Sequence, residues 1–477
     1  MIANKVAKNA LILMLATTGQ KFIAFLSFAL VARLVGPEVM GTYAYSVSIT
    51  SIFVVLSDLG MTPVVIRAIS GEKDDSEVFL SSVIKLKFIL VPIAIGASLL
   101  YGVWRNDSWE TIQIIALATV AMSADAFHLV FYGVLRGRQN LKPEAIGMFI
   151  GQVLTATVAL ITAYLGCGAL GLAGALASGS IWNVLWAGLN VRKDAFRLVK
   201  VRFYDLKKLF YQALPFAVAG IAVKIYSYVD SLMLEIYQGK LEVGYYAIAY
   251  KLTYAMQFIP LTFTAALYPA LSASFAKNDT VELRKTFLGA MRIMAVTGFP
   301  IVAGLSALAP NLITMIYGDK YLNSIPVMQI LPWVLLPIFL DFPIGALLNG
   351  SNRAHLKTIT MVSTMFLNFG LNFILIPRYG SVGAGIAGVV SFWFLFIMGA
   401  YFVRNDLGSI RPIFFIVIRA LIASIFSWLV WHFSVLYISF FGGAFLGIVF
   451  VVFIAFLSHL LTKEEFLLLW KRFKVKF

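Results

Sequence analysis

Three lysines, Lys21, Lys224 and Lys251, lie deep within otherwise apolar stretches of the chain. An ionisable side chain in hydrocarbon costs about 2.5–3.5 kcal/mol even on a lenient insertion scale, so it is expected to face a wet cavity or a partner. A lysine ammonium acts as a point charge for phosphate. The three lysines therefore favour a cationic cavity for an anionic group such as a diphosphate or an acidic sugar.

Internal ion pairs are the alternative explanation for these lysines, because Asp58 and Asp230 lie in the same kind of stretch. Lys224 and Asp230 are six residues apart, about 120° around a helix, so they do not share one stripe. Asp58 either faces the cavity or orients the break that Gly60 introduces. Arg33 either belongs to the cavity or anchors a helix at the membrane interface. Both explanations stay open for these residues.

The composition is that of a polytopic all-α membrane protein. The chain has 477 residues, 61% of them apolar and 13% charged, and a mean hydropathy of +0.90, whereas a soluble domain is about 25% charged. Apolar runs of roughly 17–25 residues, each able to cross a bilayer, recur along it. We predict 14 transmembrane helices, at about 9–35, 39–66, 77–103, 110–135, 143–165, 169–190, 207–236, 242–275, 286–308, 323–349, 354–376, 382–403, 411–434 and 439–460.

The net charge of +16 is explained by membrane topology and not by nucleic-acid binding. Thirty of the 38 lysines and arginines fall in alternate loops, in the helix ends that flank these loops, and in the terminal segments on the same side. The positive-inside rule assigns that side to the cytoplasm. We therefore predict a multi-pass protein of the cytoplasmic membrane with both termini cytoplasmic. Five basic residues fall on the opposite side: Arg33, Arg105, Lys240, Lys320 and Arg378.

The chain contains an internal repeat, because three glycine-containing motifs recur in the same order and at the same point of a six-span unit. Parallel repeats of this kind are related by an axis along the membrane normal and favour a transporter with a central site. The motif pairs are Gly36–Ala44 with Gly239–Ala247, Leu135–Gly137 with Leu348–Gly350, and Gly171–Gly174 with Gly385–Gly388, at offsets of 203, 213 and 214 residues.

The repeat and the long basic connector between the sixth and seventh spans define the domains that we predict. These are an N-lobe of six helices (1–195), a cytoplasmic basic linker (196–206), a C-lobe of six helices (207–407), a hairpin of two further helices (408–462) and an amphipathic cytoplasmic tail (463–477). The tail alternates basic with large apolar residues, as interfacial helices do.

Several short motifs also recur in a family of transporters. They are Asp58-Leu59-Gly60 with Arg67, Leu214-Pro215, Tyr228-Val229-Asp230, Val243–Tyr246, Tyr268–Ser272 and the stretch from Asn372 to Ala384. Their order and spacing over about residues 1–405 resemble the polysaccharide transporter family of oligosaccharide flippases. That family belongs to the multidrug/oligosaccharidyl-lipid/polysaccharide exporter superfamily, with lipid II flippases and multidrug and toxin extruders.

The resemblance implies a V-shaped pair of six-helix lobes whose cavity is lined mainly by spans one, two, seven and eight. It implies a transporter, not an enzyme, with no cofactor. The substrate it implies is a polyprenyl-diphosphate-linked oligosaccharide, moved from the cytoplasmic to the outer leaflet by alternating access. Partners would be membrane lipids and the polymerase or glycosyltransferases of a polysaccharide pathway. The expected cavity residues are Lys21, Arg33, Asp58, Lys224 and Lys251.

The family resemblance does not decide whether transport is coupled to an ion. In lipid II flippases a sodium site uses an aspartate of helix seven, an asparagine and an aspartate of helix eleven, and a residue of helix twelve. Asp230 and Asn368 match this pattern, but Asn372 replaces the second aspartate. Na⁺ or H⁺ coupling through these three residues is one interpretation, and hydrogen bonding between helices by the two asparagines is the other.

Three rival functions follow from the same features. A lipid II flippase shares the architecture. A cation-coupled drug extruder shares it too, but usually has fewer spans and transports cationic substrates. A membrane polysaccharide polymerase or ligase is the rival from a different class. Such enzymes carry a large external loop, whereas every predicted external loop here is short and nearly free of charge.

Overall fold

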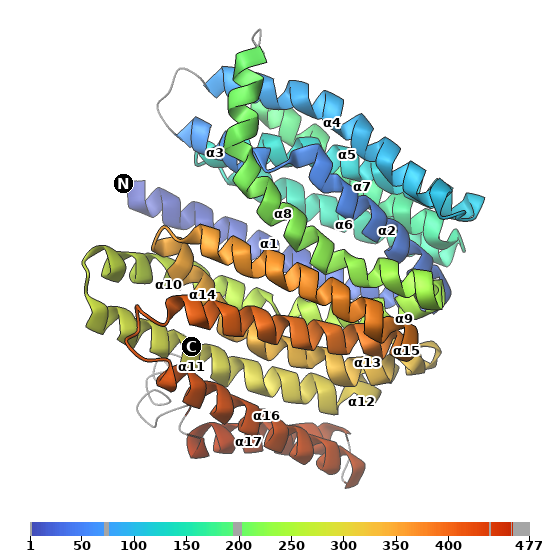
Figure 1. Cartoon of the computed structure of the whole chain (residues 1–477). Coiled ribbons are helices and arrows are strands. Elements are labelled where there is room, and N and C mark those ends of the chain that lie inside the picture. The colour runs from blue at the N-terminus through green and yellow to red at the C-terminus, as the bar shows by residue number, and fades with distance from the viewer. Residues whose placement is uncertain (1, 71–75, 194–202, 438–439, 459, 461–477) are drawn as a thin grey trace. The chain divides into compact units, whose positions relative to one another are not determined.

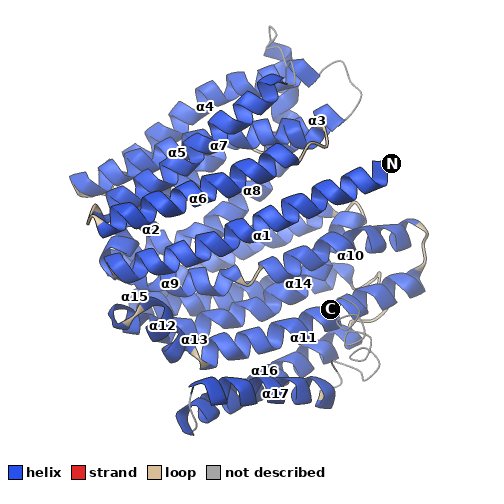
Figure 2. Cartoon of the chain, turned by 180° about the vertical axis from the view of Figure 1, so that it is seen from behind, coloured by secondary structure: helices blue, strands red, loops and turns tan. Residues whose placement is uncertain are grey.

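The computed structural model describes residues 2–70, 76–193, 203–437, 440–458 and 460, and Figure 1 shows the order of their helices. Figure 2 shows helices and loops but no strand in this described part. Ten of its helices are long and apolar enough to cross a membrane, or eleven if Lys240–Thr264 and Leu267–Ala276, which bend by 43°, form one span. The prediction of an all-α multi-pass membrane protein is confirmed, and the count of fourteen spans stays a prediction.

The chain forms two compact units, residues 1–247 and 248–477. In the first unit, α8 packs against α2, α3 and α4.

The predicted domain bounds stay a prediction, and the tail 463–477 lies outside the described residues. The helices of this unit are α1 (Ile2–Val35), α2 (Pro37–Asp58), α3 (Met61–Ser70), α4 (Ser76–Trp104), α5 (Trp109–Gly137), α6 (Lys142–Tyr164), α7 (Gly168–Lys193), α8 (Phe203–Gln238) and the first half of α9 (Lys240–Ala255).

The second unit contains the rest of α9 and the remaining helices. Its large apolar core joins α11, α14 and α16. These helices are α10 (Phe258–Ala276), α11 (Thr280–Ala307), α12 (Ala309–Tyr317), η1 (Asp319–Ser324), α13 (Ile325–Ile330), η2 (Leu331–Val334), α14 (Leu335–Gly350), α15 (Ala354–Val403), α16 (Arg411–Tyr437) and α17 (Phe440–Leu457).

Several predicted spans are broken helices. The second span divides at Leu59, which has a left-handed backbone with φ 42°, and Gly60, with φ 72°. The tenth predicted span, rich in proline, consists of α13, η2 and α14. The eleventh and twelfth predicted spans form the single long element α15, which changes direction at Gly380 with φ 54° and ψ −134°. Glycine suits that position because it lacks the Cβ that disfavours positive φ.

Each unit repeats the same helix contact, which supports the internal repeat. A Cβ added at Gly174 of α7 would lie 3.5 Å from a methyl group of Leu117 in α5. A Cβ added at Gly388 of α15 would lie 3.9 Å from a methyl group of Leu331 in η2. Both members of the second contact lie 214 residues after those of the first. The repeated glycine motif therefore occupies equivalent packing positions in the two units.

Candidate functional site

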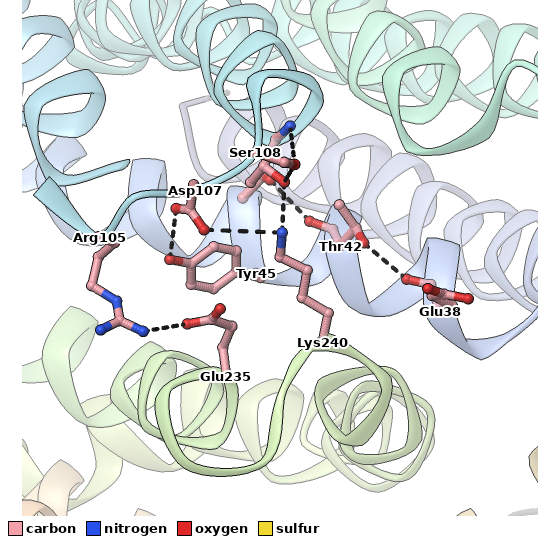
Figure 3. Close-up of polar contacts among 10 residues, drawn as sticks. Glu38, Thr42, Tyr45, Arg105, Asp107, Ser108, Glu235 and Lys240 are labelled. Carbon is pink, nitrogen blue, oxygen red and sulfur yellow. Dashed lines mark hydrogen bonds and ion pairs between the residues drawn. The ribbon is translucent and has the colours of Figure 1, made fainter. Parts of the chain in front are cut away.

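A cluster of polar side chains gathers where the start of α2, the connection between α4 and α5, and the turn between α8 and α9 meet (Figure 3). We call it the hairpin cluster. All of its members belong to the first unit. Two of them, Arg105 and Lys240, are among the five basic residues predicted to lie on the outer side. Its members are Tyr45, Arg105, Asp107, Ser108, Thr111, Glu235 and Lys240.

Two glycines let the helices of this region approach closely. A Cβ added at Gly41 of α2 would lie 1.8 Å from the carbonyl oxygen of Lys240, and one added at Gly244 of α9 would lie 2.0 Å from that of Pro37. No side chain larger than hydrogen fits at either position, and small residues at membrane helix crossings serve this purpose. Gly244 and Lys240 lie 203 residues after Gly41 and Pro37, so the two copies of the first motif meet each other reciprocally.

Lys240 connects the helix turn to the α4–α5 connection. Its Nζ donates to Oγ1 of Thr111 at 2.6 Å and lies 3.9 Å from Oδ1 of Asp107. The same ammonium lies 5.8 Å from the centre of the Tyr45 ring. The Tyr45 hydroxyl donates to Oδ2 of Asp107 at 2.9 Å. Asp107 therefore accepts a hydrogen bond from α2 and faces the lysine that begins α9, as Figure 3 shows.

A second ion pair lies beside the first. Arg105 donates from an Nη atom to Oε2 of Glu235 at 3.2 Å, which joins the end of α4 to the end of α8. Burial alone would lower the pKa of Arg105, but the hydrogen bond and the charge of Glu235 raise the pKa above its ordinary value. The guanidinium therefore stays charged at any physiological pH.

The hairpin cluster joins helices through opposite charges. It opposes two cations, Arg105 and Lys240, to two carboxylates, Asp107 and Glu235. In the described part of the chain, no group of three or more His, Cys, Asp or Glu side chains has a geometry for a metal ion. What the arrangement does is to hold the starts of α2 and α9 together through backbone contact and paired charge.

The predicted cavity lysines lie on three different helices. Lys21 is exposed on α1, and Lys251 is half-buried on α9. Lys224 is half-buried on α8, with its Nζ 5.3 Å from the centre of the Tyr228 ring one turn away. No ion pair joins Lys224 to Asp230, although both residues are described. The charge of Lys224 is therefore not neutralised by the carboxylate that the pairing interpretation assigned to it.

Asp58 has a partner that the sequence did not suggest. Lys87, which the charge bias assigns to the cytoplasmic end of the third predicted span, lies inside α4, is completely buried, and donates to Oδ1 of Asp58 at 2.8 Å. The Thr62 hydroxyl donates to the same oxygen at 2.8 Å. This arrangement agrees with the interpretation that Asp58 orients the break after α2. The sequence signal for Lys87 is its position inside the third predicted span, 77–103.

The other residues with predicted roles have defined positions. Arg33 is exposed at the end of α1. Asp230 is buried on α8 and accepts from the Tyr246 hydroxyl at 2.7 Å. In the second unit, Asn372 donates its amide to Oδ1 of Asn368 at 3.0 Å, and both are buried. The two asparagines thus bond to each other one turn apart on α15, and the role of the three residues in ion coupling stays a prediction.

The chain matches two family models. The model described as "Polysaccharide biosynthesis protein" covers residues 6–275. The model described as "MatE" covers residues 215–374. The first match includes the whole hairpin cluster and more than half of the chain.

Individual proteins agree with the family matches. A probable low-salt glycan biosynthesis flippase of Haloferax volcanii is 23% identical over 399 residues, which cover 84% of each chain. The lipid II flippase of Bacillus subtilis is 22% identical over 334 residues, covering 63% of this chain and 61% of that one. A solved structure of a lipid II flippase in an inward closed conformation superposes with a TM-score of 0.72 at 14% identity, covering 93% and 98% of the two chains. The last comparison shows a shared fold.

Proposed function

This chain belongs to the polysaccharide biosynthesis protein family, and on that premise we propose that it is a flippase for lipid-linked oligosaccharides. The observation that carries the proposal is the family match over residues 6–275 in a chain of many apolar spans. The relative from Haloferax volcanii is named as a glycan biosynthesis flippase and aligns over 84% of this chain. Relatives named as flippases support a transporter and not an enzyme.

The substrate that we propose is an oligosaccharide on a polyprenyl diphosphate, moved from the cytoplasmic to the outer leaflet of the cell membrane by alternating access. The headgroup would cross in a polar cavity while the polyprenyl tail stays in lipid. Lys21, Lys224 and Lys251 would bind the diphosphate or acidic sugars, with contributions from Arg33 and Asp58. Support comes from Lys224, a cation in a predicted span that lies against the Tyr228 ring and forms no ion pair with a carboxylate among the described residues.

The hairpin cluster has a mechanical role in this proposal. The positive-inside rule predicts that its region lies on the outer side. Contacts there between α2, α8 and α9 would keep the outer end closed while the substrate enters from the cytoplasm. The reciprocal contact at Gly41 and Gly244 and the ion pair of Arg105 with Glu235 would have to separate before release.

Coupling to Na⁺ or H⁺ is the second part of the mechanism that we propose, through Asp230 with Asn368 and Asn372. Asp230 is a buried carboxylate in a helix that the sequence predicts to span the membrane, and such groups are functional sites by default. The Tyr246 hydroxyl donates a hydrogen bond to Asp230. This neutral donor would stay beside the carboxylate after a bound cation dissociates. Coupling would appear as export that depends on the sodium or proton gradient.

A lipid II flippase is the second candidate, because a solved protein of that name shares the fold over 93% of this chain. Expression of the chain in two hosts separates the candidates. One lacks its flippase for a surface polysaccharide, and the other depends on a repressible lipid II flippase. We expect the first host to regain surface glycan and the second to lyse.

The biochemical test is the position of the glycan lipid. Without the protein, lipid-linked oligosaccharide should accumulate on the cytoplasmic leaflet, where an impermeant glycan-modifying enzyme added outside does not reach it. If the intermediate reaches the outer leaflet normally but is not polymerised, the protein is a polymerase or ligase and the flippase proposal fails.

A further inference from the structure

A pocket of about 320 Å³ lies between α11 and α16 in the second unit. Figures 1 and 2 show these two helices side by side. The volume falls in the range of about 300–1,000 Å³ that is usual for small-ligand pockets. The residues that line it are Leu288, Arg292, Arg411, Pro412, Phe415, Ile416 and Arg419. None of the features used for the proposed function lies here.

Three arginines give this pocket an unusual charge for a membrane helix surface. Arg292, Arg411 and Arg419 are all exposed, and none forms an ion pair with a carboxylate in the described part of the chain. Arg292 and Arg419 lie within candidate membrane spans, Thr280–Ala307 and Arg411–Val435. Arg411 is the first residue of its candidate span. Three cations that line one pocket without a carboxylate partner favour an anionic ligand from outside the chain.

We propose that Arg292, Arg411 and Arg419 bind the phosphate group of a membrane lipid in the cleft between α11 and α16. A guanidinium carries five N–H donors in a planar fork, which matches phosphate oxygens in bidentate fashion. Basic pockets between membrane helices on the cytoplasmic side are recognised sites for phosphate-bearing headgroups.

The rest of the pocket suits the lipid part of such a ligand. Leu288, Phe415 and Ile416 supply apolar surface beside the arginines, and Phe415 is exposed. The two segments that hold the arginines belong to loops and helix ends predicted to be cytoplasmic. The bound lipid would therefore belong to the cytoplasmic leaflet. Without a defined site, each arginine would extend separately towards the surrounding headgroups, and no single lipid would be bound preferentially.

The phosphate group bound at this site could belong to a phospholipid or to the polyprenyl diphosphate carrier. The site itself does not depend on the proposed function, and only the second source does. We would titrate purified full-length protein with phosphatidylglycerol, with a diacylglycerol of the same acyl chains, and with polyprenyl diphosphate. Native mass spectrometry would count the bound lipids. The variant is Arg292→Gln/Arg411→Gln/Arg419→Gln, and the matched control is Arg284→Gln, an exposed arginine on α11 outside the pocket.

Wild type and the Arg284→Gln control should bind one phosphate-bearing lipid more tightly than the triple variant, by at least about tenfold. Tighter binding of polyprenyl diphosphate would identify the carrier, and tighter binding of phosphatidylglycerol a phospholipid. Equal affinities in wild type and triple variant, or the same arginine dependence for diacylglycerol, would overturn the proposal. If the triple variant does not purify as a monodisperse protein, the single change Arg419→Gln gives the same comparison. Because lipid binding and not export is measured, failure here leaves the flippase proposal standing.

Discussion

Lys87 donates to the carboxylate of Asp58 from inside the neighbouring helix α4, and to the carbonyl oxygen of Ser57 at 3.1 Å. The carbonyl groups at the end of a helix lack partners within the helix and attract cations. One buried ammonium thus closes the end of α2 and neutralises the residue that turns the chain into α3. The pair therefore lies directly beside the break in the second span.

We predict that Lys87→Met destabilises the protein by about 3–5 kcal/mol, the usual cost of breaking a buried ion pair from one side. The Asp58 side chain is 26% exposed, which places the expectation at the lower end. The measurement is the thermal midpoint of detergent-purified protein. The double change with Asp58→Asn should recover most of the loss. Lys85→Met is the control, because Lys85 is exposed on the same helix; an equal effect there would show that the pair is not responsible.

Lys224→Ala should reduce glycan export at least about tenfold while the protein still accumulates in the membrane, because the charge has no carboxylate pair to lose. Lys224→Arg should keep part of the activity, since it keeps the charge but not the compact ammonium. Adding Asp230→Ala should not restore export, because Asp230 is bonded to Tyr246 instead. Rescue by this double variant would mean that Lys224 is a structural residue.

Gly41→Ala should impair export severely, because the added methyl would meet a main-chain oxygen at 1.8 Å. Gly220→Ala on α8 is the matched control, since nothing lies within 4 Å of a Cβ added there. Export and protein level should both stay near wild type in the control. Equal activity of the two variants at equal protein level would show that the close contact has no part in transport.

Reversing one charge of the Arg105–Glu235 pair should weaken the hairpin cluster. Glu235→Arg places two cations beside each other, and we expect lower export with little change in protein level. The exchange Arg105→Glu with Glu235→Arg restores the opposite charges and should recover export. Both side chains are partly exposed, so the coupling is expected to be about 1 kcal/mol or less. Absence of any recovery would indicate that the arginine has a role other than this pair.

The topology can be tested on the native chain, because its one cysteine is exposed. Cys167 lies between α6 and α7, on the predicted outer side, so an impermeant thiol reagent should label it in intact cells. Asn278→Cys in a Cys167→Ala background lies between α10 and α11 and should be labelled only after the cells are opened. The reverse pattern would invert the orientation and the direction of transport.

Much of the fold could be predicted because helical membrane spans and their breaks have local signals. The glycine motifs at Gly41 and Gly244 indicated a repeat, and proline-rich sequence indicated the broken tenth span. Pairings between distant helices have no such signal. No sequence signal pairs Lys87 with Asp58, 29 residues away, or Glu235 with Arg105, 130 residues away. Which lysine faces which carboxylate is decided by helix rotation, and composition does not encode it.

The contact at Gly41 and Gly244 has a genetic consequence. Each glycine is opposed by a main-chain carbonyl oxygen, of Lys240 or of Pro37, and not by a side chain. Every amino acid carries the same carbonyl, so no replacement of the opposing residue makes room for a larger side chain. Suppressors of a Gly41→Ala defect are therefore not expected at residue 240. They should arise at positions where a substitution shifts a whole helix. Selection would then keep Gly41 and Gly244 as glycine independently of which residue opposes each of them.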